Sequence, residues 1–351
     1  MSSVPSISIA GRRIASDEPP YIIAELSANH NGQLSKAFEL IEAAKLAGAD
    51  AIKVQTYRPD TITLNSNRPE FQIHGGLWAG RTLYELYEEA HTPWEWHGPL
   101  FNRAREIGIT MFSSPFDATA IELLQSLRAS AYKIASFELV DLPLIRLAAR
   151  TGKPLIMSTG MASKVEISEA VAAAREVGNR DLALLHCVSG YPAPASDYNL
   201  RTIGDMALSF NVIAGLSDHT LDNSTAIASV AIGASIIEKH FTLDRSGGGP
   251  DDSFSLEPKD MSALCRDTRT AWEALGTVNY ELQSSEQQNA RFRRSLYFTR
   301  DLRAGDEVGP DCVRSVRPGF GLAPKFLEQV IGKKLKRDVE FATPVMWDLL
   351  R

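Results

Sequence analysis

Eight short apolar runs, each closed by polar residues, constrain the fold of this chain more than any other feature. Segments with helical spacing of apolar residues separate the runs, as at 36–45. Near-continuous apolar strands suit a parallel sheet that is covered on both faces. Eight such repeats predict a TIM (β/α)8 barrel. An open doubly wound sheet is the alternative, but the first strand-to-helix turn lacks the Gly-x-Gly-x-x-Gly pattern that would favour such a sheet. The runs span 21–26, 51–57, 109–116, 131–138, 154–161, 182–191, 212–219 and 235–243.

The remainder of the chain predicts a second, smaller unit. Residues 1–277 hold the barrel, and the polar stretch 278–292 lacks a hydrophobic stripe and is typical of a linker. Residues 293–351 are short apolar runs separated by glycine and proline, as in a compact, turn-rich domain. A unit of this size is marginally stable alone, so we expect it to dock on a partner surface.

Composition excludes several classes of protein. The net charge of −6 comes without a concentrated basic stretch, so we expect no nucleic-acid partner. The three cysteines have no CxxC spacing, which argues against disulfides and a thiolate zinc site and favours a reducing compartment. Neither a signal peptide nor an apolar stretch long enough to span a membrane is evident, so we expect a cytoplasmic protein.

One connection, at 58–92, is far longer than ordinary strand-to-helix loops. It is rich in aromatic residues, among them Phe71, Trp78, Tyr84 and Tyr87. A packed surface loop would account for these residues. Its position on the catalytic face of a barrel favours a lid that excludes water from the site.

Polar residues end nearly every predicted strand, where barrel enzymes carry their catalytic groups. Each one alone could be a capping or turn residue. Lys53, Lys133 and Glu238, however, stand within apolar runs, where an unpaired charge is costly, so together they predict one polar pocket. The two lysines and nearby serines suit a phosphate monoester, unless each lysine only pairs with Glu25, Glu138 or Glu238.

Two histidines, His219 and His240, end the last two strands. A lone histidine is more often a core residue, but two at adjacent strand ends predict a divalent metal site. No cysteine or HExxH context accompanies them, which favours an open site completed by water or substrate. The glycine-rich loop 244–252 follows, and Asp251 or Asp252 could face substrate hydroxyls.

With these motifs the chain resembles the sialic acid synthase family, in which a barrel precedes a small antifreeze-like (SAF) domain. The segments that carry the resemblance are 23–25, 29–32, 53–55, 158–161, 215–220, 238–242 and 317–321. Segments 76–84 and 92–96 are similar to the pseudaminic acid synthase branch of that family.

The resemblance implies that phosphoenolpyruvate condenses with 2,4-diacetamido-2,4,6-trideoxy-altrose and water to give pseudaminic acid and phosphate, in a pathway that decorates surface glycans or flagellin. It implies Glu25, His219 and His240 in catalysis, the two histidines holding Mn²⁺, with Mg²⁺ or Co²⁺ as alternatives. The implied phosphoenolpyruvate ligands are Lys53, Ser114, Lys133, Ser136, Ser158, Ser189 and Ser217, although the sialic acid branch commonly has asparagine in place of Ser189. The implied sugar ligands are Gln55, Glu138, Tyr191, Asp251 and Arg317.

The resemblance also implies a homodimer with exchanged C-terminal domains, in which Arg317 reaches the neighbouring subunit's substrate; otherwise Arg317 caps a turn in its own domain. Three other functions stay open. A sibling enzyme would make N-acetylneuraminic or legionaminic acid from a manno-configured amino sugar. A Schiff-base aldolase would use Lys133 or Lys239 as nucleophile. A non-catalytic protein would only bind a sugar.

Overall fold

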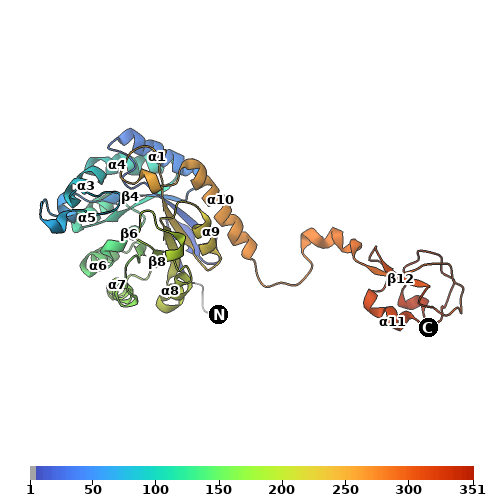
Figure 1. Ribbon diagram of the computed structural model, residues 1–351. Coiled ribbons are helices and arrows are strands. Elements are labelled where there is room, and N and C mark those ends of the chain that lie inside the picture. The colour runs from blue at the N-terminus through green and yellow to red at the C-terminus, as the bar shows by residue number, and fades with distance from the viewer. Residues whose placement is uncertain (1–4) are drawn as a thin grey trace. The chain divides into compact units, whose positions relative to one another are not determined.

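The computed structural model describes residues 5–351, which form two compact units divided between Gly276 and Thr277 (Figure 1). The larger unit contains a closed barrel of eight parallel strands. Its first and last strands, β3 and β10, pair directly, from Ile236 opposite Tyr21 to His240 opposite Glu25. The predicted barrel is therefore confirmed, and the open-sheet alternative is wrong. The strands are β3 (Tyr21–Glu25), β4 (Ala51–Thr56), β5 (Thr110–Pro115), β6 (Tyr132–Ile134), β7 (Leu155–Ser158), β8 (Leu182–Cys187), β9 (Ile213–Asp218) and β10 (Ile236–His240).

Amphipathic helices cover the outside of the barrel (Figure 1). In α1, Ala37, Leu40, Ile41 and Ala44 recur at helical spacing and are all buried, which is the pattern of a helix with one apolar face. The helix ends at Gly48, whose φ of 93° suits glycine. The outer helices are α1 (Leu34–Ala47), α4 (His97–Ile107), α5 (Ala118–Ser126), α6 (Leu142–Arg150), α7 (Lys164–Glu176), α8 (Thr202–Phe210), α9 (Ser224–Val230) and α10 (Pro258–Leu275).

A two-stranded antiparallel hairpin precedes the barrel, formed by β1 (Ser6–Ile9) and β2 (Arg12–Ala15). Its Ile7, Ile9 and Ile14 belong to the same apolar cluster as the side chains inside the barrel. The hairpin therefore closes the end of the barrel opposite the carboxyl ends of the strands. The pattern of eight apolar runs did not predict this element.

The long connection after β4 contains α2 (Pro59–Ile62), a short 3-10 turn (Pro69–Phe71) and α3 (Leu83–Ala90). Helix α3 begins with a capping box, in which the Thr82 hydroxyl accepts from the Glu85 amide and the Glu85 carboxylate accepts from the Thr82 amide. A single bridge between Gln72 and Thr82 joins the two halves of the segment. The connection is thus an ordered structure rather than an open loop.

The smaller unit has its own core. Strands β11 (Ser295–Phe298) and β12 (Val313–Val316) pair antiparallel, and a short helix, α11 (Leu327–Val330), follows. Leu296, Phe298 and Val345 are among its fully buried residues. Within the predicted linker, Ser284–Phe292 forms an exposed 3-10 helix.

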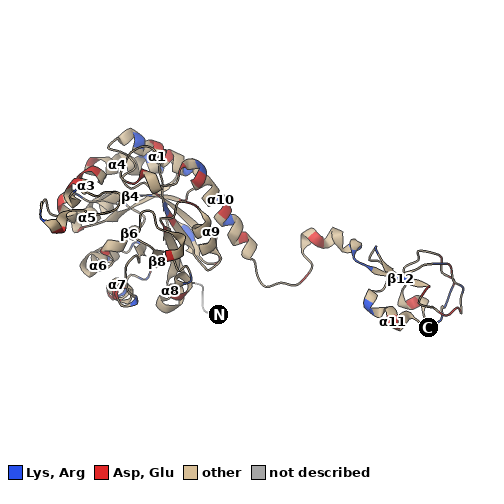
Figure 2. Cartoon of the chain, viewed as in Figure 1, with Lys and Arg blue, Asp and Glu red and all other residues tan. Residues whose placement is uncertain are grey.

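Charged residues of both signs alternate along the outer helices, for example in α1 and α10 (Figure 2). Across the described residues, 5–351, the helices are all too short or too polar to span a membrane.

Candidate active site

A two-residue alternation along the barrel strands builds the site. The barrel interior is filled by apolar residues of the strands, such as Ile23, Ala51 and Ile236. Two residues further along, the same inward face carries polar groups: Ile23 leads to Glu25, and Ala51 leads to Lys53. The inward residues at the carboxyl end of the barrel are Glu25, Lys53, Gln55, Ser114, Lys133, Ser158, Cys187, Ser217, Glu238 and His240.

Two buried lysines and two buried glutamates pair at the centre of this layer. Lys53 Nζ lies 2.5 Å from Glu25 Oε2 and 3.9 Å from Glu238 Oε1, and it donates to Ser114 Oγ at 3.3 Å. Lys133 Nζ lies 3.3 Å from Glu238 Oε1. Ser217 Oγ donates to that same carboxylate oxygen at 3.3 Å. The predicted pairing of the lysines with Glu25 and Glu238 is therefore present, and it occurs within a single cluster rather than at isolated sites.

The ionisation of these groups follows from burial and from their neighbours. Burial lowers the pKa of Lys53, but the carboxylates of Glu238 and Glu25 outweigh burial and raise it overall. Burial lowers the pKa of Lys133, and its neighbours do not compensate. Burial raises the pKa of Glu238, but Lys133 and Lys53 lower it overall. The cluster therefore keeps Lys53 as a cation and Glu238 as an anion.

Serine hydroxyls surround the cluster on the side of β6, β7 and β8. Ser136 Oγ accepts from the Gly160 amide at 3.1 Å, and a Cβ added at Gly160 would collide with the hydroxyls of Ser136 and Ser189. The buried Oγ atoms of Ser158 and Ser189 have no hydrogen-bond partner within the described chain. Buried polar atoms normally have a partner, so these unpartnered hydroxyls point to a ligand with acceptor oxygens.

The two histidines adjoin each other beside this cluster. The ring centroids of His219 and His240 are 5.4 Å apart, and Tyr191 lies over His219 with a centroid distance of 4.3 Å. Phe254 contacts His240 at a centroid distance of 5.0 Å. The rings therefore form a compact aromatic group that limits the access of water to the histidines.

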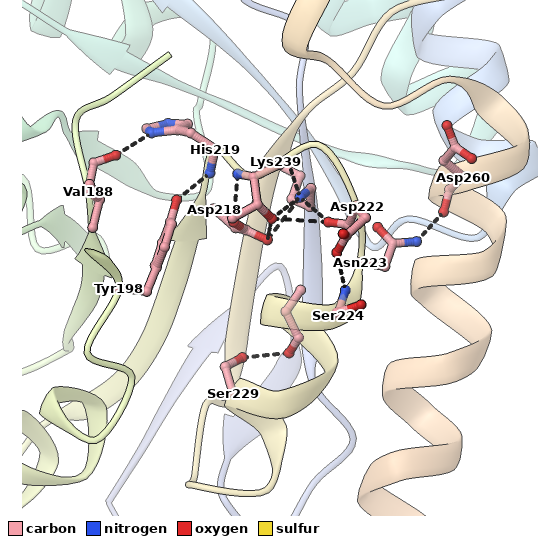
Figure 3. Close-up of polar contacts among 12 residues, drawn as sticks. Val188, Tyr198, Asp218, His219, Asp222, Asn223, Ser224, Ser229, Lys239 and Asp260 are labelled. Atoms are coloured by element: carbon pink, nitrogen blue, oxygen red, sulfur yellow. Dashed lines mark hydrogen bonds and ion pairs between the residues drawn. The ribbon is translucent and has the colours of Figure 1, made fainter. Parts of the chain in front are cut away.

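The two imidazoles fit a divalent metal. The Val188 carbonyl lies 2.7 Å from His219 Nδ1 and orients the ring (Figure 3). Burial lowers the pKa of His219, but the Cys187 thiol and the Val188 carbonyl outweigh burial and raise it overall, so a metal would displace a proton from this ring. Burial lowers the pKa of His240 well below its ordinary value, which keeps that ring neutral, as a metal ligand must be. His240 Nδ1 is buried and has no hydrogen-bond partner in the part of the chain that is described. Residues 5–351 contain no group of three or more histidine, cysteine, aspartate or glutamate side chains placed to hold a metal.

The intervening residues of the same two motifs face outward. Lys239 is opposite Asp218 in the register of β10 and β9, and Lys239 Nζ lies 2.8 Å from Asp218 Oδ2. Lys239 also donates to the carbonyls of Thr220 and Asp222, both at 2.8 Å (Figure 3). Lys239 is therefore a structural residue saturated with acceptors, and it is wrong as a candidate Schiff-base nucleophile.

A second hydrogen-bonded group links the glycine-rich loop to the barrel. Ser27 donates to Asp251 Oδ2, and Asp251 Oδ2 lies 3.8 Å from His240 Nδ1. Gln55 Nε2 donates to Glu25 Oε1 and to Ser27 Oγ, both at 3.1 Å. Burial raises the pKa of Asp251, although the hydrogen bond from Ser27 opposes the rise.

The long connection reaches this group through Trp78. The Trp78 ring lies against Tyr191 at a centroid distance of 5.8 Å, and its Nε1 donates to the Pro250 carbonyl at 3.0 Å. An aromatic series therefore runs from Trp78 through Tyr191 to His219.

Some predicted residues stand apart. Glu138 follows β6, and its buried Oε2 has no hydrogen-bond partner among the described residues. Burial raises the pKa of Glu138 to about 7. Arg317 belongs to the smaller unit, where it is exposed and adjoins a cavity of about 480 Å³ that Phe320 and Phe341 help to line. Asp117, which follows the third barrel strand, caps α5 by accepting from the amides of Thr119 and Ala120.

Sequence reasoning missed three residues at the site. Cys187 is the inward residue of β8, and the two-residue spacing from Ala183 and Leu185 could have identified it. Tyr198 accepts from the His219 amide at 2.6 Å, and Ser27 joins Gln55 to Asp251. No local pattern marks Tyr198 or Ser27, because their contacts depend on loops that are distant in sequence.

Proteins and protein families of known function are similar to this chain. Residues 40–280 match the model of the NeuB family, and residues 293–351 match the SAF domain. The chain is 47% identical to a pseudaminic acid synthase of Campylobacter jejuni, covering 93% of this chain and 95% of that protein. It is 43% identical to a pseudaminic acid synthase of Helicobacter pylori, covering 94% of this chain and 98% of that protein.

A solved structure gives the same result at the level of the fold. The N-acetylneuraminic acid synthetase of Leptospira borgpetersenii, in complex with citrate, is 32% identical and superimposes with a TM-score of 0.73. The match covers 82% of this chain and 96% of that chain. With a family model that spans well over half of the sequence and an SAF domain after it, this chain belongs to the NeuB family.

Proposed function

We propose that this protein is a pseudaminic acid synthase, which condenses phosphoenolpyruvate with 2,4-diacetamido-2,4,6-trideoxy-altrose and water to give pseudaminic acid and phosphate. The observation that carries the proposal is the layer of paired lysines, unpartnered serine hydroxyls and adjacent histidines at one end of the barrel. The branch is supported by the two pseudaminic acid synthases at 47% and 43% identity, against 32% for the N-acetylneuraminic acid synthetase.

Phosphoenolpyruvate carries a carboxylate and a phosphate, so its site must supply cations and donors. Lys53 and Lys133 provide the cations, and both are buried, where charge-assisted hydrogen bonds are strong. Ser114, Ser136, Ser158, Ser189 and Ser217 provide hydroxyl donors around them. Lys133 pairs only with Glu238, and burial lowers its pKa, so an incoming phosphate would favour its cationic form.

We place the sugar next to this cluster, against Gln55, Glu138, Tyr191 and Asp251. The C3 atom of phosphoenolpyruvate forms a carbon–carbon bond to the aldehyde carbon of the open-chain sugar, whose oxygen takes up a proton. Positive charge then develops at C2 and is met by the carboxylate of Glu25, which also orients the water that adds there. The C2–O bond breaks, phosphate leaves, and C2 becomes the ketone of the product.

Synthases of this family are in general metal-dependent, and we assign the metal to His219 and His240. A bound divalent ion, with Mn²⁺ the first candidate, supplies Lewis-acid polarisation of the sugar aldehyde. The chain's own contribution is to hold both rings: Val188 and Tyr198 position His219, and Phe254 packs on His240. Histidine ligands accept several divalent metals, so Mg²⁺ and Co²⁺ are to be compared with Mn²⁺.

The SAF domain contributes Arg317 to the site of a neighbouring subunit in a homodimer with exchanged C-terminal domains. The exposure of Arg317 beside a cavity with aromatic walls supports a role in binding. The guanidinium provides donors for the acyl oxygen of the sugar's acetamido group.

The deciding experiment measures phosphate release by the metal-loaded protein with phosphoenolpyruvate and one sugar at a time. The sugars are the diacetamido-altrose, N-acetylmannosamine and the diacetamido-mannose analogue. We expect release with the altrose sugar that stops on chelation and returns with Mn²⁺. Release only with a manno sugar would transfer the protein to a sibling branch, and no release with any sugar would contradict the synthase function.

A further inference from the structure

Ser27 is a buried residue with an unusual backbone, two residues after the end of β3. Its φ is 48°, in the left-handed region that side chains with a Cβ rarely occupy, and its exposed fraction is 3%. Such strain persists only where the surrounding contacts hold it, and it is enriched at functional sites. The contacts of Ser27 are with residues of the candidate active site.

The Ser27 hydroxyl connects two residues that are distant in sequence. It donates to Asp251 Oδ2 in the loop after β10, and it accepts from Gln55 Nε2 of β4 at 3.1 Å. The second N–H of Gln55 Nε2 donates to Glu25 Oε1 at 3.1 Å. A continuous chain of hydrogen bonds therefore runs from Glu25 through Gln55 and Ser27 to Asp251.

The two ends of this chain set its direction. Glu25 and Asp251 are carboxylates, which in their ionised form only accept hydrogen bonds. Ser27 has one hydroxyl proton, and donating it to Asp251 leaves its oxygen to accept from Gln55. Gln55 must then turn its NH2 group toward Ser27 and Glu25, so its carbonyl oxygen is directed away from this chain. Ser27 thereby orients two acceptors, the amide oxygen of Gln55 and the carboxylate of Asp251.

We propose that Ser27 is a positioning residue that sets Gln55 and Asp251 as paired acceptors for the N–H and O–H donors of the amino sugar. The inference rests on the proposed function, in which these two residues contact the sugar. Amino sugars that differ in configuration direct their amide and hydroxyl donors differently, so a fixed pair of acceptors discriminates between them. Ser27 acts through its two neighbours and does not itself touch the reacting atoms.

The test compares Ser27→Ala and Ser27→Gly with the wild-type protein. Both variants remove the hydroxyl, and glycine also relieves the left-handed backbone. Loss of this hydrogen-bonded positioning is expected to raise the KM for the altrose sugar roughly tenfold in both variants. The KM for phosphoenolpyruvate is expected to stay within about twofold, and the preference for the altrose over the manno sugar is expected to fall roughly tenfold.

Ala10→Gly is the matched control. Ala10 has a φ of 49° in the turn of the β1–β2 hairpin, at the closed end of the barrel. Replacing it with glycine relieves the same kind of strain without touching the site, and both KM values should stay unchanged. Thermal unfolding of each variant checks the fold, and Ser27→Gly is the more tolerant of the two site variants because its backbone is unstrained.

Two outcomes would overturn the inference. A sugar KM within twofold of wild type in both variants would mean that Ser27 does not position the acceptors. A parallel rise in the KM for both substrates, with lower thermal stability, would mean that Ser27 only maintains the loop. Failure of the proposed function is distinguishable, because it would appear as a wild-type protein that releases no phosphate with any sugar.

Discussion

At the scale of single residues, neighbouring positions in two short motifs, 217–219 and 238–240, face opposite sides of the barrel wall. Ser217, His219, Glu238 and His240 face the barrel interior, whereas Asp218 and Lys239 form an outward ion pair between β9 and β10. We assign the chemistry to the inward residues, and the outward pair holds the loop through the carbonyls of Thr220 and Asp222. Lys239 on β10 and Lys133 on β6 therefore have different surroundings, although both are buried lysines of the barrel strands.

The first prediction contrasts two lysines. Lys239→Met leaves the Asp218 carboxylate buried without its cation, which should lower the free energy of unfolding by about 3–5 kcal/mol. Lys133→Met leaves Glu238 with Lys53 at 3.9 Å, so its stability loss should be smaller, while phosphate release should fall at least ~100-fold. Chemical denaturation and the phosphate assay measure the two effects. A stable but inactive Lys239→Met variant, together with borohydride trapping of the wild-type protein by a carbonyl substrate, would contradict the structural role of Lys239.

The second prediction concerns Glu138 and pH. Burial raises its pKa to about 7, whereas the unfolded chain keeps the ordinary value near 4.5. Between these values the folded state binds more protons than the unfolded state, so stability falls as pH rises from about 4.5 to about 7. Glu138→Gln should remove this fall and raise the free energy of unfolding at pH 8 by roughly 1–3 kcal/mol. Denaturation curves at pH 5 and pH 8 measure it, and equal pH dependence in both proteins would be contrary to the assignment.

Much of the candidate site was predictable at this scale because charged residues inside apolar runs are conspicuous. Lys53, Lys133 and Glu238 stand out for that reason, and the structure places all three in one cluster. Ser27 and Tyr198 were not predictable, since a serine or tyrosine in a loop has no distinguishing pattern. The roles assigned to the predicted site residues stay predictions until the variants are measured.

At the scale of elements, the barrel was predictable and its additions were not. Apolar runs closed by polar residues report burial directly, and all eight correspond to barrel strands. The β1–β2 hairpin escaped notice because its strands are only four residues long and its turn is an ordinary Ala10–Gly11 pair. The connection 58–92 was recognisable as unusual by length, but its contact with Tyr191 depends on folded geometry.

The third prediction tests whether this connection acts as a lid. Trp78→Ala removes the ring that lies on Tyr191 and the donor to the Pro250 carbonyl. We expect a KM for the sugar roughly tenfold higher and a lower kcat, because water enters the site more easily. Thermal stability should change little, since Trp78 is only partly buried. Trp78→Phe keeps an aromatic ring and should fall in between; unchanged kinetics in both variants would leave the connection a packed surface loop.

At the scale of the whole molecule, the chain consists of a barrel unit and an SAF unit, each with a core of its own. Composition predicts that the barrel ends at 277 and that the second unit begins at 293, and the linker 278–292 between them stays a proposal. Sequence composition could indicate that the second unit needs a partner surface, because so small a core is marginal. It could not indicate which surface, since that depends on the complementarity of two folded faces.

The fourth prediction tests domain exchange by mixing two inactive variants. Arg317→Ala keeps an intact barrel, and His240→Ala keeps an intact SAF domain. If the domains exchange, each mixed dimer contains one complete site out of two, so isolated mixed dimers should have about half of the activity of a wild-type dimer. Co-expression with two different tags isolates the mixed dimers for the phosphate assay. Absence of restored activity in isolated mixed dimers would place Arg317 in its own subunit's site or outside any site.

The alternation in β9 and β10 has a consequence for recombination between related proteins. Because inward and outward residues differ by one position, a single-residue insertion or deletion inside either strand would exchange the two sets. Lys239 would then enter the barrel, and Glu238 and His240 would face the surrounding helices. Chimeras that cross over within these strands can therefore retain both the fold and the site only where the parents match residue for residue, whereas crossovers in the helices tolerate differences in length.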